Sequence, residues 1–307
     1  MKTFRTLMGM MLIMVSMLCF TGCGGDSTAS GTVFYLSHED SEGGFTDMIR
    51  KAFGEKAKAA GVHVEFRDAK GDVNMQIDQM KEAIAAKPGA IVLLAVDATA
   101  LVPMVEKANE AGIPIIITNR GLNGGKYLSC MVDEKQAGIM QGEYMAKHLP
   151  PNAKVVYLEG EKGFVLRWQG FKEACLDKRP DVQLLASTSA NWRTSDALRN
   201  VTLWTKLFPE IDGVIAANDN MAIGAVQALK DANRLEGCLI SGVDAVDEAL
   251  KLIENGEMSQ TVKQDPNALA DGAFRLVDAC LKGKVPSENI VVDFQSITKD
   301  NLAQFRK

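Results

Sequence analysis

The chain has 307 residues, of which 47% are hydrophobic and 24% are charged, and its formal net charge is −5. This length suffices for two domains of ordinary size. The acidic balance and the lack of a basic run argue against nucleic acid and anionic lipid as partners.

The first residues predict export. Two basic residues precede an apolar run from Leu7 to Phe20, which has the length and flanks of a secretory signal and is short for a membrane span. Small residues and Cys23 follow. The segment resembles the lipobox of bacterial lipoproteins, which implies that residues 1–22 are a signal peptide and that Cys23 is lipidated. An ordinary cleaved signal with an incidental cysteine is the alternative. Residues 23–31 are rich in Gly, Ser and Thr, which predicts a flexible tether.

Beyond the tether, short β-branched segments alternate with amphipathic helical segments. In the first half the predicted strands are 32–36, 62–67, 90–96, 113–118 and 127–132, and the predicted helices are 45–60, 74–86 and 101–110. After Pro150 and Pro151 the predicted strands are 154–159, 182–187, 213–217, 239–243, 258–263 and 290–294, and the predicted helices are 164–178, 196–207, 221–232, 247–255 and 267–281. This alternation predicts an α/β fold with two doubly wound parallel-sheet lobes.

Ligands of open parallel sheets bind beyond the carboxyl ends of the strands. The residues at those places are 37–38, 119–120, 161–167, 191–192, 218–219 and 244. They are rich in amides, carboxylates, guanidinium groups and aromatic rings. Such groups hold many hydroxyls and stack on a ring face.

Several sequence motifs point to one family. They are Gly43-Gly44-Phe45-Thr46, Ile113-Pro114 with Asn119-Arg120, Arg167-Trp168-Gln169-Gly170-Phe171, the run from Ala217 to Ala225, Gly242-Val243-Asp244, and Thr261-Val262-Lys263-Gln264. Over residues 32–294 the chain resembles the ribose-type (type I) periplasmic sugar-binding proteins of ABC importers. Residues 189–192, 119–120 and 241–244 look most like the inositol-binding branch.

The resemblance implies two lobes joined by a multi-strand hinge. The N-terminal lobe is expected to comprise residues 32–132 plus about 265–292, and the C-terminal lobe residues 133–264 plus about 293–307. Asp133 and Pro266 are then expected near the crossings between the lobes. The resemblance also implies a monomer.

The same resemblance implies a ligand-binding set. It comprises Phe45, Thr46, Asn119, Arg120, Arg167, Trp192, Asn218, Asp244 and Gln264. Phe45 and Trp192 are expected on opposite faces of the ligand, and the two arginines are expected to donate to neighbouring hydroxyls. Core packing of the rings and surface ion pairs of the arginines are the alternatives. Asp219 is expected to cap a helix. His38 is expected either to contact the ligand or to lie at the rim or hinge.

The predicted function is that of an extracytoplasmic substrate-binding lipoprotein that captures inositol or a related cyclic polyol by hinge closure and delivers it to an ABC permease. A ligand-sensing receptor component in chemotaxis or kinase signalling is the alternative. A repressor with the same core is disfavoured because a signal and lipobox occupy the place of its DNA-binding helices. The chain has no GxSxG, HExxH or P-loop motif, which disfavours an enzyme.

No cofactor and no metal are expected, because the histidines are far apart and no CxxC motif is present. Four cysteines follow Cys23, and their placement on separate elements favours buried free thiols over disulfides. These are Cys130, Cys175, Cys238 and Cys280.

Overall fold

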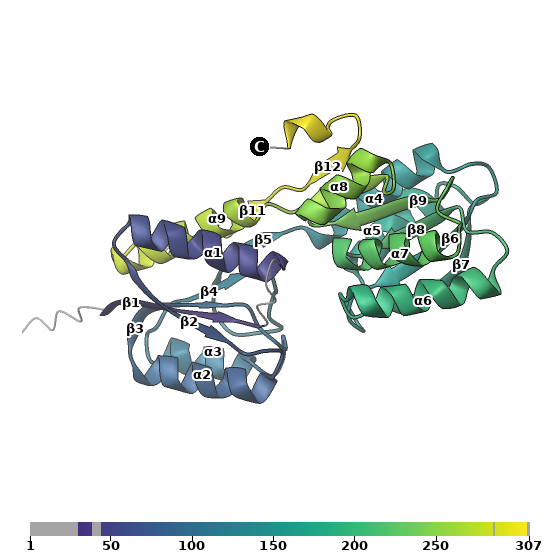
Figure 1. Cartoon of the computed structure of the whole chain (residues 1–307). Helices are drawn as coiled ribbons and strands as arrows, with labels where there is room; N and C mark the ends of the chain where they lie inside the picture. The colour runs from purple at the N-terminus through teal and green to yellow at the C-terminus, as the bar shows by residue number, and fades with distance from the viewer. Residues whose placement is uncertain (1–29, 39–43, 285, 306–307) are drawn as a thin grey trace, which may run out of the picture.

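The described chain folds into two α/β lobes, and each contains a six-stranded sheet (Figure 1). The computed structural model describes residues 30–38, 44–284 and 286–305. The predicted signal peptide, Cys23 and most of the predicted tether lie outside the described residues.

The sheet of the first lobe has the strand order β11-β5-β4-β3-β1-β2, and its neighbouring strands are all parallel. The strands are β1 (Ser30–Ser37), β2 (His63–Asp68), β3 (Pro88–Leu93), β4 (Ile115–Thr118), β5 (Leu128–Val132) and β11 (Ile290–Val292). The helices are α1 (Phe45–Ala59), α2 (Val73–Ala85), α3 (Val102–Glu110) and α9 (Pro266–Leu281). Val33 and Tyr35 pack in the cluster that contains α1 and α9, whereas Phe34 and Leu36 pack in the cluster of α2 and α3. Helices therefore cover both faces, which explains the continuous apolar runs of the central strands.

The second lobe repeats this arrangement with the strand order β12-β10-β9-β8-β6-β7. Its strands are β6 (Lys154–Glu159), β7 (Gln183–Ser189), β8 (Gly213–Ala216), β9 (Leu239–Val243), β10 (Gln260–Lys263) and β12 (Gln295–Thr298). Its helices are α4 (Glu134–His148), α5 (Leu166–Phe171), α6 (Thr194–Leu207), α7 (Asp219–Asp231) and α8 (Asp247–Asn255), followed near the C-terminus by the short 3₁₀ helix η2 (Leu302–Gln304). All neighbouring strands are parallel except β12, which pairs antiparallel with β10. The predicted two-lobe α/β fold is thus confirmed.

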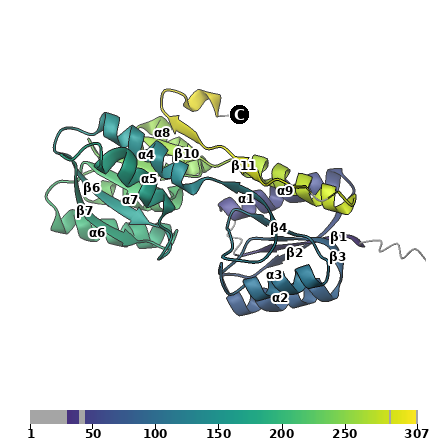
Figure 2. The ribbon, with the colours of Figure 1, turned by 180° about the vertical axis from the view of Figure 1, so that it is seen from behind.

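The chain passes between the lobes after β5, after β10, and between β11 and β12 (Figures 1 and 2). At the first crossing Asp133 caps α4 and accepts a hydrogen bond from the backbone N–H of Lys135. At the second, Asp265 caps α9 and Pro266 is the first helical residue. Each crossing is short. Residues that follow the carboxyl ends of strands in both sheets line one cavity, so these ends face each other across a cleft.

Helix α4 is absent from the elements predicted from the sequence. Its Gly138 and Gly142 weaken the helical pattern, but the packing against α5 requires them. A Cβ on Gly138 would lie 1.9 Å from the carbonyl oxygen of Arg167, and one on Gly142 would lie 2.9 Å from that of Phe171.

Two other segments also differ from the prediction. The helix predicted over 164–178 begins at Leu166 and becomes a single π-helical segment, η1 (Lys172–Leu176). The strand predicted over 290–294 ends at Val292, because the chain leaves the first sheet there and continues as β12 in the second.

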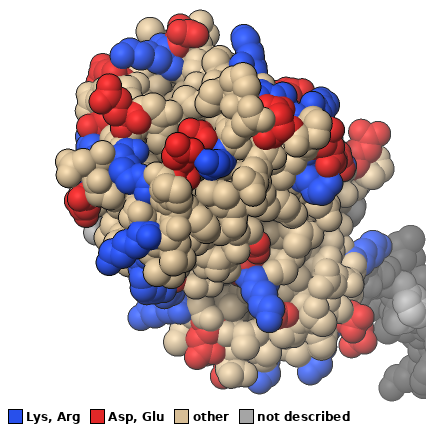
Figure 3. Space-filling model, turned by 90° about the vertical axis from the view of Figure 1, so that its right-hand side faces the viewer, with Lys and Arg blue, Asp and Glu red and all other residues tan. Residues whose placement is uncertain are grey.

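The face of the molecule in Figure 3 and the cysteines of the described chain give no sign of a second kind of site. The face of the second lobe in Figure 3 carries basic and acidic side chains intermixed among uncharged areas. The four cysteines of the described chain are free thiols, as predicted, and all but Cys238 are buried. Burial raises the pKa of Cys130 and of Cys175 to about 11, so both are protonated and unreactive at neutral pH.

Candidate functional site

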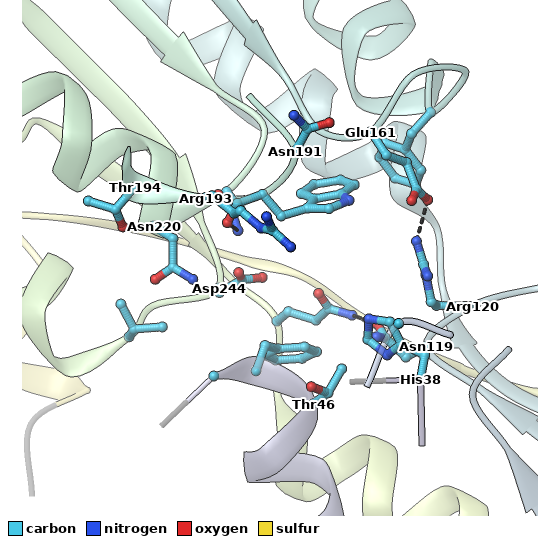
Figure 4. Close-up of a pocket in the computed structure, with 18 of the residues that line it drawn as sticks. His38, Thr46, Asn119, Arg120, Glu161, Asn191, Arg193, Thr194, Asn220 and Asp244 are labelled. Carbon is cyan, nitrogen blue, oxygen red and sulfur yellow. Dashed lines mark hydrogen bonds and ion pairs between the residues drawn. The ribbon is translucent and has the colours of Figure 1, made fainter. Parts of the chain in front are cut away.

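A cavity of about 770 Å³ opens between the two lobes. Loops that follow the carboxyl ends of the strands in both sheets form its lining, the usual ligand site of such sheets. The structure brings all nine residues of the predicted ligand-binding set to this cavity: Phe45, Thr46, Asn119, Arg120, Arg167, Trp192, Asn218, Asp244 and Gln264. In Figure 4, Thr46, Asn119 and His38 of the first lobe face Asp244 and Arg193 of the second.

Arg167 of α5 is almost fully buried, with 4% of its surface exposed. Its Nε donates to the carboxylate of Glu134 at 2.6 Å, and its Nη1 donates to the carbonyl oxygen of Ala217. Its Nη2 lies 3.4 Å from Oε1 of Gln264. Burial opposes the charge of the guanidinium, but the carboxylates of Glu134 and Asp244 outweigh it and hold the pKa of Arg167 above its ordinary value. Arg167 is therefore a fixed cation on the second-lobe wall of the cavity.

Asp244 points into the cavity from the loop after β9 (Figure 4). Burial raises the pKa of its carboxyl to about 7; the guanidinium of Arg167 lowers this value and the carboxylate of Glu134 adds to it. No hydrogen bond to this carboxylate is formed within the described chain. Its oxygens are thus available to a ligand, and its charge changes near neutral pH.

Asp219 holds the loop that carries Asp244. Its carboxylate is fully buried and accepts hydrogen bonds from Oγ1 of Thr261 at 2.8 Å and from the backbone N–H of Val246 at 3.0 Å. Burial, and then the charge of Asp244, raise the pKa of Asp219 well above its ordinary value. The expectation that Asp219 caps α7 is wrong. Asn218 is the cap, because its Oδ1 accepts from the backbone N–H of Met221 at 3.0 Å.

Trp192 forms an aromatic part of the second-lobe wall. A Cβ on Gly160 would lie 2.2 Å from the indole, so only glycine fits beneath the ring. Phe164 meets the indole edge-on, with ring centroids 4.9 Å apart, and the guanidinium of Arg167 lies 5.7 Å from the Trp192 ring. The Nδ2 of Asn218 donates to the carbonyl oxygen of Trp192 at 3.4 Å. These contacts fix the orientation of the ring.

The first lobe contributes Phe45 and Thr46 from the start of α1, and Asn119 and Arg120 from the loop after β4. Asn119 accepts a hydrogen bond from Nε2 of Gln264 at 3.2 Å, which links the loop to the second crossing. Burial, and then the positive charge of Arg120, lower the pKa of His38 to about 3. His38 is therefore neutral at physiological pH.

The backbone is strained where these loops enter the cavity. Asn119, Asn191, Trp192 and Asp244 have φ angles of 64°, 51°, 62° and 118°. Such values are uncommon for residues other than glycine, and they concentrate where side chains are positioned for function.

The cavity also contains residues that are missing from the predicted set. Glu134 is one of them. It lies at the start of α4, a helix that the sequence pattern did not predict. The pattern of Asp133 followed three residues later by Gln136 is a helix-start signal that could have revealed it. Three further lining residues lie in or beside segments that follow predicted strands, but the sequence analysis assigned them no role: Glu161, Phe164 and Arg193.

Within the described ranges, no group of three or more His, Cys, Asp or Glu side chains is arranged to hold a metal ion. No helix of the same residues is long and apolar enough to cross a membrane.

Residues 33–285 match the model of the family described as periplasmic binding protein domain. The chain belongs to this family. A xylitol-binding protein of Mycolicibacterium smegmatis is 31% identical over 298 residues, which cover 93% of this chain and 83% of the relative. The comparisons support the branch of type I sugar-binding proteins of ABC importers, whose members are binding proteins and not enzymes.

Solved structures agree with this assignment. A solute-binding protein of an ABC transporter from Actinobacillus succinogenes, with bound D-allose, superposes with a TM-score of 0.85 at 28% identity, covering 89% of this chain and 99% of that one. One from Bacillus halodurans, with bound myo-inositol, gives a TM-score of 0.84 at 28% identity, covering 92% and 98%. Membership of the family implies an exported protein that works with ABC transporter components.

Proposed function

We propose that this chain captures an uncharged cyclic polyol, inositol or a close relative, between its two lobes and delivers it to an ABC permease. We further propose that it is a monomer anchored through lipid on Cys23. The lobes, residues 32–132 plus about 265–292 and 133–264 plus about 293–307, would close as two bodies about the three crossings.

The observation that carries this proposal is the balance of charge in the cavity. Among the described lining residues, the cations are Arg120, Arg167 and Arg193, and the carboxylates are Glu134, Glu161 and Asp244. Arg167 is paired with Glu134, and Arg120 with Glu161. A phosphorylated or otherwise anionic ligand would find two of these three guanidinium groups already paired with carboxylates. A neutral ligand with many hydroxyls is favoured instead.

The remaining groups suit such a ligand. Amide side chains of Asn119, Asn218 and Gln264 can donate and accept, and Asp244 accepts from hydroxyls. The rings of Phe45 and Trp192 offer apolar faces to the C–H groups of a six-membered ring. Hydrogen bonds to charged groups contribute about 1.5–3 kcal/mol each. A few of them are compatible with micromolar affinity after the free-energy cost of closing the lobes is subtracted.

The relatives bind different members of this ligand class. The xylitol-binding relative and the structures with D-allose and myo-inositol share polyhydroxylated ligands, which supports the class. The cyclic polyol is our choice within it, because residues 189–192, 119–120 and 241–244 resemble the inositol-binding branch.

A thermal-shift screen of the protein lacking residues 1–23 tests the proposal. The panel contains inositols, pentoses, hexoses and linear polyols. We expect one or a few cyclic polyols to raise the melting temperature, and Trp192→Ala and Arg167→Ala to abolish the shift. Arg199→Ala removes an exposed arginine of α6 and serves as the control. If no member of the panel shifts the melting temperature, the polyol assignment is wrong.

A further inference from the structure

Away from the three crossings, one ion pair between described residues connects the two lobes directly. Nη2 of Arg120, after β4 in the first lobe, donates to Oε1 of Glu161, after β6 in the second. Figure 4 shows this contact at one side of the cavity. The Nη1 of Arg120 also donates to the carbonyl oxygen of Ala95 at 3.4 Å, so both terminal nitrogens of this guanidinium contact other residues of the chain.

Glu161 belongs to a loop that is coupled to the cavity wall. The loop, residues 160–165, connects β6 to α5. At its start Gly160 lies directly beneath the indole of Trp192, and near its end Phe164 packs edge-on against the same ring. The guanidinium of Arg167 lies 5.6 Å from the Phe164 ring. A force on Glu161 from the opposite lobe therefore acts on the loop that positions Trp192 and Arg167.

We propose that Glu161 is a positioning residue that latches the lobes together through Arg120 and thereby holds loop 160–165 over the occupied cavity. The side chain of Glu161 is 47% exposed and that of Arg120 is 21% exposed, so salt weakens the latch. A latch stabilises the closed form by the same amount whichever ligand is inside. Its loss should speed the dissociation of every ligand by a similar factor and leave selectivity unchanged.

The kinetic test rests on the proposed function and compares Glu161→Gln with Glu173→Gln. Glu173 forms an exposed ion pair with Lys135 at 2.8 Å, but within the second lobe, so it is a matched control. For the best ligand and a weaker ligand of the screen, we expect Glu161→Gln to accelerate dissociation by about two- to fivefold at low salt. At high salt the wild type should approach the variant, and Glu173→Gln should match the wild type. Unchanged dissociation, different factors for the two ligands, or an equal effect of Glu173→Gln would overturn the latch.

A ligand-free measurement separates this proposal from the polyol assignment. Small-angle X-ray scattering at low salt should give a larger radius of gyration for Glu161→Gln than for the wild type. The reversed pair Arg120→Glu with Glu161→Arg should restore the smaller radius, although ligand contacts of Arg120 are lost. Equal radii for the wild type and Glu161→Gln would overturn the latch even if the screen identifies a ligand. A larger radius for Glu161→Gln would support it even if no ligand of the panel binds, and a smaller one would overturn it.

Discussion

Asp244 makes the ligand-free cavity sensitive to pH. Its carboxyl has a pKa of about 7 in the folded protein, against 3.8 as the reference value. The folded state therefore binds more protons than the unfolded state between these values. The contribution of Asp244 to stability should therefore decrease as the pH rises from about 4 to about 7 and then stay level, because above pH 7 both states carry the charge.

Asp244→Asn should remove the loss of stability that ionisation of Asp244 causes. We expect the variant to stabilise the ligand-free protein by about 1–3 kcal/mol at pH 8 and by little at pH 4. Denaturant titrations at several pH values measure the difference. Asp247→Asn, which removes an exposed carboxylate nearby, is the control and should follow the wild type. A stabilisation that is the same at pH 4 and pH 8 would refute this origin of the pH dependence.

At the scale of single residues, sequence reasoning located the cavity better than it assigned the individual contacts. Residue types after strands identified the positions of Trp192 and Asp244, because the carboxyl ends of parallel strands meet at one edge. The helix cap was assigned to Asp219 instead of Asn218, since both residue types can cap a helix and only the hydrogen-bond partners in the folded chain distinguish them. The partners Glu134 and Glu161 depend on how segments far apart in the chain approach each other, and sequence spacing does not contain that information.

At the scale of elements, the contact between α4 and α5 determines where Arg167 lies. Gly170 of α5 faces the backbone of α4, and a Cβ there would lie 2.1 Å from the carbonyl oxygen of Lys135 and 2.7 Å from the amide nitrogen of Ile139. Backbone atoms cannot yield as a flexible side chain can. Gly138 and Gly142, which weaken the helical pattern of α4 in the sequence, permit the same close packing from the side of α4.

Gly170→Ala should separate the two helices. We expect a loss of about 1–3 kcal/mol in unfolding free energy and weaker ligand binding, because Arg167 moves away from Glu134. Gly54→Ala in α1 is the control. Its Cβ would meet a side-chain atom of the Phe66 ring at 3.2 Å, and alanine favours the helix, so its effect should be within about 1 kcal/mol. Equal effects of the two substitutions would show that the close approach of α4 and α5 is not what requires glycine at position 170.

At the scale of the whole molecule, the alternation of strands and helices predicted both lobes, because each βα unit carries its own periodicity. It did not predict how the last segment of the chain divides between the two sheets. The β-branched residues after 290 read as one strand, yet the chain changes sheets at Asp293 and Phe294. That change depends on which lobe residues 290–292 and 295–298 each contact, and a local sequence pattern does not contain this information.

Phe294 lies at this crossing and is 5% exposed. It belongs to a buried cluster that includes Val132 of the first sheet and Val243 and Val262 of the second. One apolar core therefore extends through the hinge. Because unfolding either lobe would expose part of this shared cluster, we expect the wild type to unfold in a single cooperative transition despite its two lobes.

Phe294→Ala should weaken this coupling. We expect a loss of about 3–5 kcal/mol and the appearance of two thermal transitions by calorimetry. Phe294→Leu keeps most of the apolar volume and should retain one transition. A ligand that bridges the lobes binds only when both are folded, and at a concentration of 100 times Kd it contributes about 2.7 kcal/mol, so it should bring the two transitions of Phe294→Ala together again. If Phe294→Ala lowers the stability but leaves a single transition without ligand, the lobes are coupled through contacts other than this cluster.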